Sequence, residues 1–169
     1  MNQILEFLGV YSTLIPLGLA AVLGALVGFE RLLHTQITGA RTHMLVSMGA
    51  AAFVLAAREA FGGNNDSLTR IVQGVASGIG FIGAGAILKL TQPVEIRGLT
   101  TASTVWLSAS IGIACGLEIY RVSIWSTILA LIVLAVLRPF ERRIEDQSHL
   151  RADRDLDSKL LPYDADLPE

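Results

Sequence analysis

Two carboxylates lie beside apolar segments, where acidic side chains can do chemistry. Glu30 directly follows one apolar segment, and Asp66 shortly precedes another. A carboxylate at a membrane edge needs a partner or a hydrated cavity, and one or two carboxylates suffice for Mg²⁺, which keeps several waters. Ion handling is therefore one interpretation. The other is structural pairing on a helix face, of Asp66 with Arg70 four residues on and of Glu118 with Arg121 three residues on.

Basic and hydroxyl side chains gather in two short segments, residues 39–42 and residues 97–104. The candidate site residues there are Arg41, Thr42, Arg97, Thr100 and Thr101. A threonine at a helix start accepts hydrogen bonds from free backbone N–H groups, so a helix cap with interhelical hydrogen bonds explains the hydroxyls. The functional alternative is a polar vestibule beside Glu30, which requires the two segments to lie next to each other in the folded protein.

Catalytic residues are not predicted. His34, His43 and His149 do not form a metal-ligand spacing with Cys115, and no serine has the sequence context of a nucleophile elbow. We therefore expect a protein that is not an enzyme and needs no cofactor. Mg²⁺ is the ion that the carboxylates would suit.

The glycines carry a pattern that resembles a nucleotide-binding motif. Residues 78–83 match GxGxxG, but dinucleotide binding needs a preceding strand, a βαβ unit and a downstream acidic residue. Small residues let membrane helices approach closely, so we predict helix packing instead. The packing glycines are Gly24 and Gly28, in a GxxxG, and Gly74, Gly78, Gly80, Gly83 and Gly85. A helix break that offers carbonyl oxygens to an ion is the alternative.

The composition indicates an integral membrane protein. Hydrophobic residues make up 52% of the chain and the mean hydropathy is +0.56, whereas charged residues make up only 17%, against about 25% in soluble domains. The net charge of −2 and the lack of a basic stripe argue against nucleic-acid binding. A single cysteine excludes an intrachain disulfide. The first apolar run has no basic residues before it, so we expect a retained anchor rather than a cleaved signal peptide.

Five segments approach the roughly 20 residues that a helix needs to cross a bilayer. They cover about 8–29, 44–61, 71–90, 101–120 and 122–137. The sequence thus predicts an all-α polytopic protein, with Pro16 in the early turns of the first helix. Residues 1–140 form the predicted transmembrane domain. Residues 141–169 form a short polar C-terminal tail, partly helical and then weakly ordered, because acidic residues and prolines replace apolar ones.

Basic residues predict the orientation. If the tail is cytoplasmic and there are five spans, the N-terminus lies outside. The outer segments then hold only Arg58, Arg70 and Arg121, and the basic residues of the inner segments outnumber them, chiefly because of the tail. This bias agrees with the positive-inside rule.

Several motifs in a fixed order resemble the MgtC/SapB family of bacterial inner-membrane proteins. The similarity covers about residues 14–140. Its most specific segments are SGIGFIGAG at 77–85 and RGLTTA at 97–102. GART at 39–42 and Trp106 also match the family pattern. We expect the chain to differ from MgtC proper by lacking the cytoplasmic ACT-like domain after its fifth span, which favours the SapB-like members.

The resemblance implies a protein of the bacterial cytoplasmic membrane linked to growth at low Mg²⁺ and, for some relatives, to survival inside host cells. It implies regulation, including inhibition of the F-type ATP synthase. The glycine-rich helix face adds the hypothesis that the protein acts by binding helices of other membrane components. Two alternatives remain: a small transporter or channel for Mg²⁺ or another ion, and a homo-oligomeric membrane scaffold built on GxxxG contacts.

Overall fold

The computed structural model describes residues 2–33, 39–91 and 94–137. The chain divides into two compact units, residues 1–131 and residues 132–169. The packing described below belongs to the first unit; of the second, the structure describes only the helical residues 132–137. The predicted tail at 141–169 lies outside the described residues.

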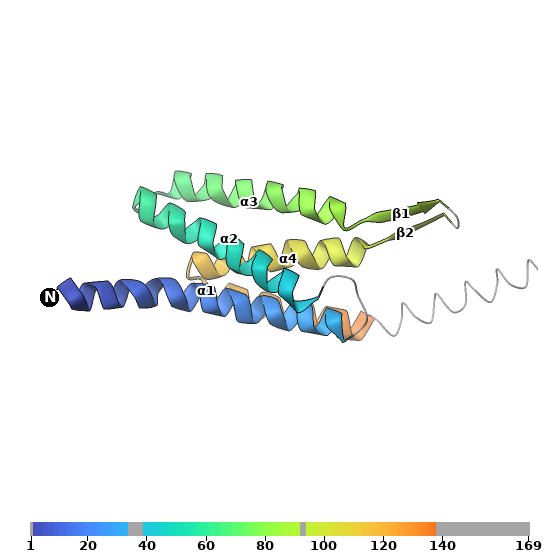
Figure 1. Cartoon of the computed structure of the whole chain (residues 1–169), viewed down its shortest axis with the longest axis horizontal. Coiled ribbons are helices and arrows are strands. Elements are labelled where there is room, and N and C mark those ends of the chain that lie inside the picture. Colours follow the sequence, from blue (N-terminus) through green and yellow to red (C-terminus); the bar gives the residue numbers. More distant parts are fainter. Residues whose placement is uncertain (1, 34–38, 92–93, 138–169) are drawn as a thin grey trace, which may run out of the picture. The chain divides into compact units, whose positions relative to one another are not determined.

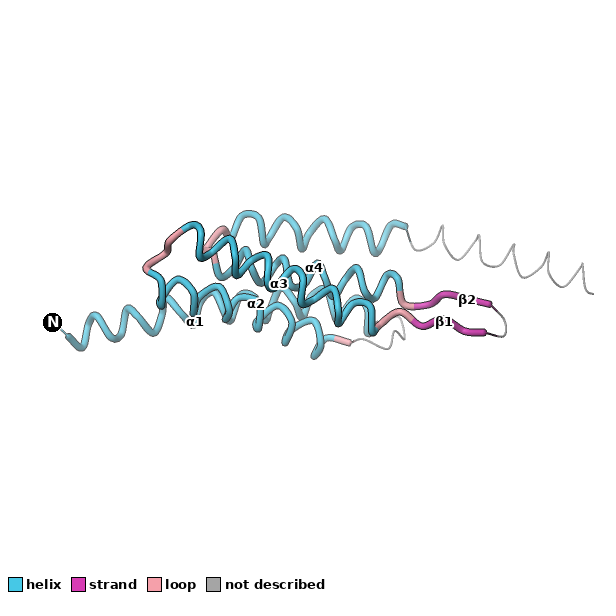
Figure 2. Tube along the Cα trace, turned by 90° about the horizontal axis from the view of Figure 1, so that it is seen from above, coloured by secondary structure: helices cyan, strands magenta, loops and turns pink. Residues whose placement is uncertain are grey.

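Long helices dominate the described chain (Figures 1 and 2). In order, the elements are α1 (Asn2–Leu32), α2 (Ala40–Phe61), α3 (Asn65–Gly85), β1 (Leu88–Thr91), β2 (Val94–Arg97), α4 (Leu99–Gly116) and a further helix, Tyr120–Leu137. Helix α2 packs against both α1 and α4, and α3 packs against α2 and α4. The predicted all-α class is confirmed.

Four helices of the described chain are long and apolar enough to cross a membrane. They are Val10–Leu32 within α1, Ala40–Phe61, Leu99–Gly116 and Tyr120–Leu137. The expected third span, 71–90, is not among them. Its helix, α3, begins earlier, at the polar residues Asn65 and Asp66, and ends earlier, at Gly85. Arg70, Gln73 and the five glycines lower its hydropathy, although α3 packs against both α2 and α4.

Two further boundaries differ from the expectation. Pro16 is buried well inside α1 instead of lying in its early turns, because the helix begins at Asn2. The expected turn before α4 is an antiparallel hairpin that pairs Leu88 with Arg97 and Thr91 with Val94. Gly98 ends the hairpin at a φ of 94°, and a Cβ there would overlap the Ala86 carbonyl oxygen. Only glycine meets both conditions.

Helix α2 is held between two glycine pairs of identical spacing. On α1, a Cβ at Gly24 would lie 2.6 Å from the His43 carbonyl oxygen, and one at Gly28 would lie 2.6 Å from the Ala40 Cα. On α4, a Cβ at Gly112 would overlap the carbonyl oxygen of Ser47. The second α4 glycine, four residues on at 116, would place a Cβ 2.8 Å from the α2 backbone. The missing side chains therefore set the distances between α1, α2 and α4.

Candidate functional site

We call the end of the bundle that carries β1 and β2 the hairpin end, and the end at the Gly62–Asn64 turn the turn end. A buried polar cluster lies near the hairpin end, where α1 ends and α2 and α4 begin. It comprises Arg31 of α1, His43 and Ser47 of α2, and Thr101, Thr104 and Ser108 of α4. A buried polar group is costly without a hydrogen bond, so the partners of these side chains decide the stability of the junction.

His43 joins the start of α2 to α4. Its ring is fully buried, with Nδ1 3.0 Å from the Gly39 carbonyl oxygen and Nε2 3.2 Å from Thr104 Oγ1. A carbonyl oxygen can only accept, so Nδ1 carries a proton and donates to Gly39. In the neutral ring Nε2 then accepts from the Thr104 hydroxyl. The backbone carbonyl before α2 thus selects the histidine tautomer.

The Thr104 hydroxyl has one proton and two acceptors within reach. Its oxygen lies 3.0 Å from the Thr101 carbonyl oxygen as well as 3.2 Å from His43 Nε2. With a neutral ring the proton goes to His43; with a charged ring Nε2–H donates and the hydroxyl donates to Thr101 instead. The hydrogen bonds are therefore coupled, because only one of the two arrangements fits each state of the ring.

Arg31 joins the end of α1 to the same turn of α4. Its Nη2 donates to Thr101 Oγ1 at 3.3 Å, and both residues are buried. Ser108 donates back to the Thr104 carbonyl oxygen at 3.0 Å. Ser47 Oγ is buried, and among the described residues it has no hydrogen-bond partner. The cluster therefore contacts all three helices, and it is packed rather than open.

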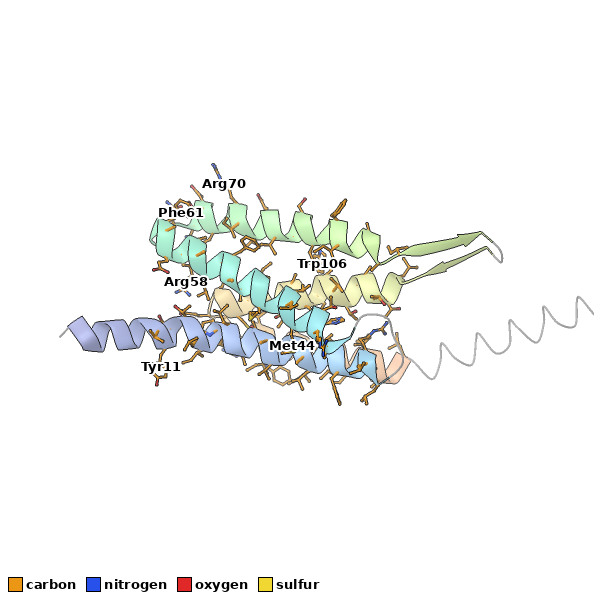
Figure 3. All side chains as sticks on the ribbon, in the orientation of Figure 1. Tyr11, Met44, Arg58, Phe61, Arg70 and Trp106 are labelled. Carbon is orange, nitrogen blue, oxygen red and sulfur yellow. The ribbon has the colours of Figure 1, made fainter. Side chains whose placement is uncertain are left out.

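The structure does not bring the predicted site residues together. Thr101 is buried and Glu30 half-buried at the hairpin end, where Arg41, Thr42 and Thr100 are exposed. Asp66 and Arg70 are exposed in the first turns of α3, near the turn end, where Figure 3 shows Arg70. Arg97 ends β2, opposite Leu88. Convergence of Glu30, Arg41, Asp66 and Thr101 on one cavity, which would favour ion handling, is therefore not observed. Among the described residues, no group of three or more His, Cys, Asp or Glu could hold a metal ion.

Three of the predicted local contacts differ in the structure. The N-cap of α4 is Gly98, without a side-chain cap; Thr101 lies inside the first turns and accepts from Arg31 instead. Asn64 caps α3 by accepting from two backbone N–H groups, and the exposed pair Asp66 and Arg70 forms no ion pair within the described chain. Glu118 pairs across helices rather than along its own, as described next.

An ion pair closes the turn end. Arg58 Nη1 lies 2.7 Å from Glu118 Oε1 and 3.1 Å from the Gly116 carbonyl oxygen, with the two side chains 33% and 39% exposed. The pair gives Arg58, near the end of a membrane helix, the partner that a charge at that depth needs. Glu118 has a φ of 61°, in the left-handed region that a residue with a Cβ rarely adopts.

Replacing Glu118 should separate the ion pair from the backbone strain. We expect Glu118→Gln to lower the free energy of unfolding by about 0.2–1 kcal/mol, the usual contribution of an exposed pair. Glu118→Gly loses the same pair but relieves the left-handed strain, so it should be more stable than Glu118→Gln by up to about 1 kcal/mol. Unfolding in mixed micelles, followed by circular dichroism, measures both values. Equal unfolding midpoints for the two variants would contradict the strain argument.

The α3 glycines differ from the expected close packing. A Cβ at Gly83 would make an ordinary contact of 3.7 Å with Ala102, but at Gly74, Gly78, Gly80 and Gly85 it would meet nothing within 4 Å. The reason is that α3 has neighbours on one side only: its buried residues are Ile79 and Gly83. The helix is also continuous through the glycines, so the alternative of a helix break is not observed.

Two grooves flank α3 instead. The α2–α3 groove, of about 640 Å³, is mainly apolar and is lined by Leu45, Val46, Gly49, Ala50, Phe53, Arg70, Ile71, Gly74, Val75, Gly78, Ile79, Ile82 and Ala109. The α3–α4 groove, of about 400 Å³, is lined by Ile79, Gly80, Gly83, Ala84, Ile87, Ala102, Ser103 and Trp106. Trp106, drawn between α3 and α4 in Figure 3, is 51% exposed.

Sequence reasoning missed part of this arrangement although some signals were present. Gly112 and Gly116 form a GxxxG with the same spacing as Gly24 and Gly28. His43 follows the GART segment and starts an apolar helix, a place where a polar side chain needs a partner. The local pattern carries no signal for the identity of that partner.

Apolar helices of membrane-spanning length, packed through glycine pairs and joined by a buried polar cluster, define a polytopic α-helical membrane protein. The chain belongs to the MgtC family, whose family model matches residues 17–143.

Two relatives illustrate the similarity. Protein MgtC of Brucella abortus (strain 2308) is 40% identical over 132 residues, which cover 78% of this chain and 54% of that protein. Protein MgtC of Salmonella typhimurium (strain LT2) is 42% identical over 125 residues, covering 74% and 52%. The chain therefore spans about half the length of the curated relatives it matches. No solved structure is significantly similar to it.

Proposed function

We propose that this protein is a non-enzymatic regulator in the bacterial inner membrane that acts in Mg²⁺-linked physiology by binding helices of other membrane proteins. We count α3 as a fifth crossing, which places the N-terminus outside and the C-terminus in the cytoplasm, in agreement with the distribution of basic residues. The link to Mg²⁺ and to the F-type ATP synthase, as a partner to test, rests on the family resemblance. The observation that carries the binding mode is the α3–α4 groove.

The groove has the composition of a helix-docking surface. Five of its residues are small: Gly80, Gly83, Ala84, Ala102 and Ser103. In a bilayer, where apolar surfaces have no water to escape, helices associate through close backbone approach over such residues. Trp106 stands half-exposed beside them, and tryptophan is enriched among the residues that contribute most to binding. A partner helix with small residues on one face fits this surface.

Photocrosslinking from the groove tests the proposal. A photoreactive benzoylphenylalanine at position 106 should crosslink a specific membrane protein in cells grown at low Mg²⁺, with subunits of the F-type ATP synthase membrane sector as first candidates. Position 125 is the matched control, because Trp125 is also an exposed tryptophan, at 61%, but lies outside the groove. Gly80→Leu should reduce the crosslink at least about tenfold by filling the groove.

A functional measurement accompanies the crosslink. ATP synthesis in membrane vesicles should fall when the protein is present and recover with Gly80→Leu. Gly18→Leu, at a glycine of α1 with nothing within 4 Å of its Cβ position, should have no such effect. Equal crosslinking from positions 106 and 125 would overturn the proposed docking surface. Crosslinking of a specific partner unrelated to the ATP synthase would support the docking surface but would contradict the ATP synthase as the partner.

A further inference from the structure

The α2–α3 groove shares only Ile79 with the proposed docking surface, and three of its lining positions are glycine. A Cβ at Gly49 on α2, or at Gly74 or Gly78 on α3, would meet nothing within 4 Å. At the base of the groove lie Ala50, Ile79 and Ala109, which are buried in the core. Helix α2 ends and α3 begins at the turn end, and the two helices separate toward the hairpin end (Figure 1). The groove is therefore a mainly apolar channel between the two helices, open on its outer side.

The dimensions of the groove match one leaflet of a bilayer. From Arg70 to Ile82 the lining covers twelve residue steps of α3, a rise of about 18 Å. Half of a hydrocarbon core is about 15 Å thick. A single acyl chain that enters at the turn end would thus follow the groove to about the middle of the membrane.

Charged residues continue the groove beyond its apolar part. Asp66, Arg70, Gly74 and Gly78 are spaced four residues apart on α3, so they follow one helix face at intervals of about 6 Å. Arg70 lines the groove, and Asp66 lies one turn nearer the helix start. Both side chains are exposed, and in the described chain they form no ion pair with each other or with another residue. A cation and an anion are thus available at the mouth of the groove.

We propose that the α2–α3 groove binds one phospholipid with an ammonium headgroup, such as phosphatidylethanolamine. Its acyl chain lies over Gly74 and Gly78, its phosphate accepts hydrogen bonds from the Arg70 guanidinium, and its ammonium pairs with Asp66. The order of chain, phosphate and ammonium in the lipid is the order of glycines, arginine and aspartate along α3. Arginine suits phosphate because its planar donors can bind two oxygens at once.

Native mass spectrometry of the full chain in detergent tests the site with dioleoyl phosphatidylethanolamine and dioleoyl phosphatidylglycerol as probes. The wild type should retain one tightly bound lipid and prefer the ethanolamine lipid by about threefold, as expected for an exposed ion pair. Gly74→Leu, which fills the groove, and Arg70→Gln, which removes the phosphate donor, should each weaken binding of both lipids about tenfold. Asp66→Asn should abolish the headgroup preference while leaving affinity for phosphatidylglycerol unreduced.

Matched variants exclude general effects. Gly18→Leu adds the same side chain to α1 outside the groove, and Arg121→Gln removes another exposed arginine; both should bind lipid like the wild type. If Gly74→Leu folds poorly, Gly49→Leu fills the groove from the α2 side. Unchanged lipid binding in the filled variants would overturn the proposal. The proposal would also be overturned if the filled variants lost protein dimers but kept bound lipid. The groove would then be the contact site for a second copy of the chain. A preference that survives Asp66→Asn would overturn the headgroup assignment.

Discussion

Replacing Gly112 by alanine should destabilise the bundle severely. A Cβ at this position would overlap the backbone carbonyl oxygen of Ser47 on α2, and a backbone atom cannot move aside as a flexible side chain can. Because α2 also packs closely against Gly24 and Gly28 of α1, it cannot move away from α4 without clashing with α1. We expect a loss of about 3 kcal/mol or more in the free energy of unfolding, at the upper end of overpacking effects.

Two measurements check this expectation. Unfolding in mixed micelles gives the midpoint by circular dichroism, and maleimide labelling of Cys115, the one cysteine of the chain and fully buried, reports separation of α4 from its neighbours. Gly18→Ala is the control, since nothing lies within 4 Å of its Cβ position; it should be neutral or stabilise α1 by up to about 1 kcal/mol. If Gly112→Ala unfolds at the wild-type midpoint, α2 and α4 do not approach as closely as described.

Replacing His43 by alanine should have the second largest effect. The change removes two hydrogen bonds, to the Gly39 carbonyl oxygen and to Thr104 Oγ1, and leaves a cavity where a fully buried ring was. An unsatisfied buried polar group costs about 1–3 kcal/mol, and the cavity adds to it. A total loss of about 2–4 kcal/mol is expected. Met44→Ala, a partly exposed neighbour on α2, should stay within about 0.5 kcal/mol of the wild type.

A double-mutant cycle separates the hydrogen bond from the cavity. His43→Phe keeps most of the volume, and Thr104→Val removes the hydroxyl, so the two changes together remove both partners. We expect a coupling free energy of about 1 kcal/mol, with the double variant less destabilised than the sum of the single ones. Additive effects would mean that the ring and the hydroxyl do not depend on each other, and that His43 acts through packing alone.

The grooves on both sides of α3 give this helix a role different from that of its neighbours. Its buried residues are only Ile79 and Gly83, and Phe81 is 85% exposed. Helices α1, α2 and α4 form a tightly packed unit, whereas most of the α3 surface is exposed. A regulator needs such a surface, because residues already used for internal packing cannot bind a partner.

The sequence predicted the fold class correctly. Four of the five expected spans are helices of membrane-spanning length, because a run of about 20 apolar residues has few other stable forms in a bilayer. The third helix shows the limit of this reasoning. The helix begins earlier than expected, with a polar first turn that Asn64 caps. The expected last residues of the helix lie instead in the first strand of the hairpin. Helix boundaries depend on caps and strand pairing as well as on hydropathy.

The spacing of the glycines predicted helix faces that allow close packing, but not which of these faces would contact another helix. Gly24 with Gly28 and Gly74 with Gly78 are the same GxxxG pattern; the first pair contacts α2 closely, and the second faces open space. The difference is the presence of a neighbouring helix, which no local pattern encodes.

The sequence by itself determined that apolar helices cross a membrane, that small residues recur on their faces, and that the chain resembles the MgtC family. Only the tertiary structure decided that Arg31 contacts Thr101 and His43 contacts Thr104, across sequence separations of 70 and 61 residues. Composition and periodicity are local patterns that extend over a few helical turns, so they determine where helices form and which of their faces are apolar. Which polar groups meet depends on which helices are neighbours and on their register, and the glycine contacts on both sides of α2 set that register.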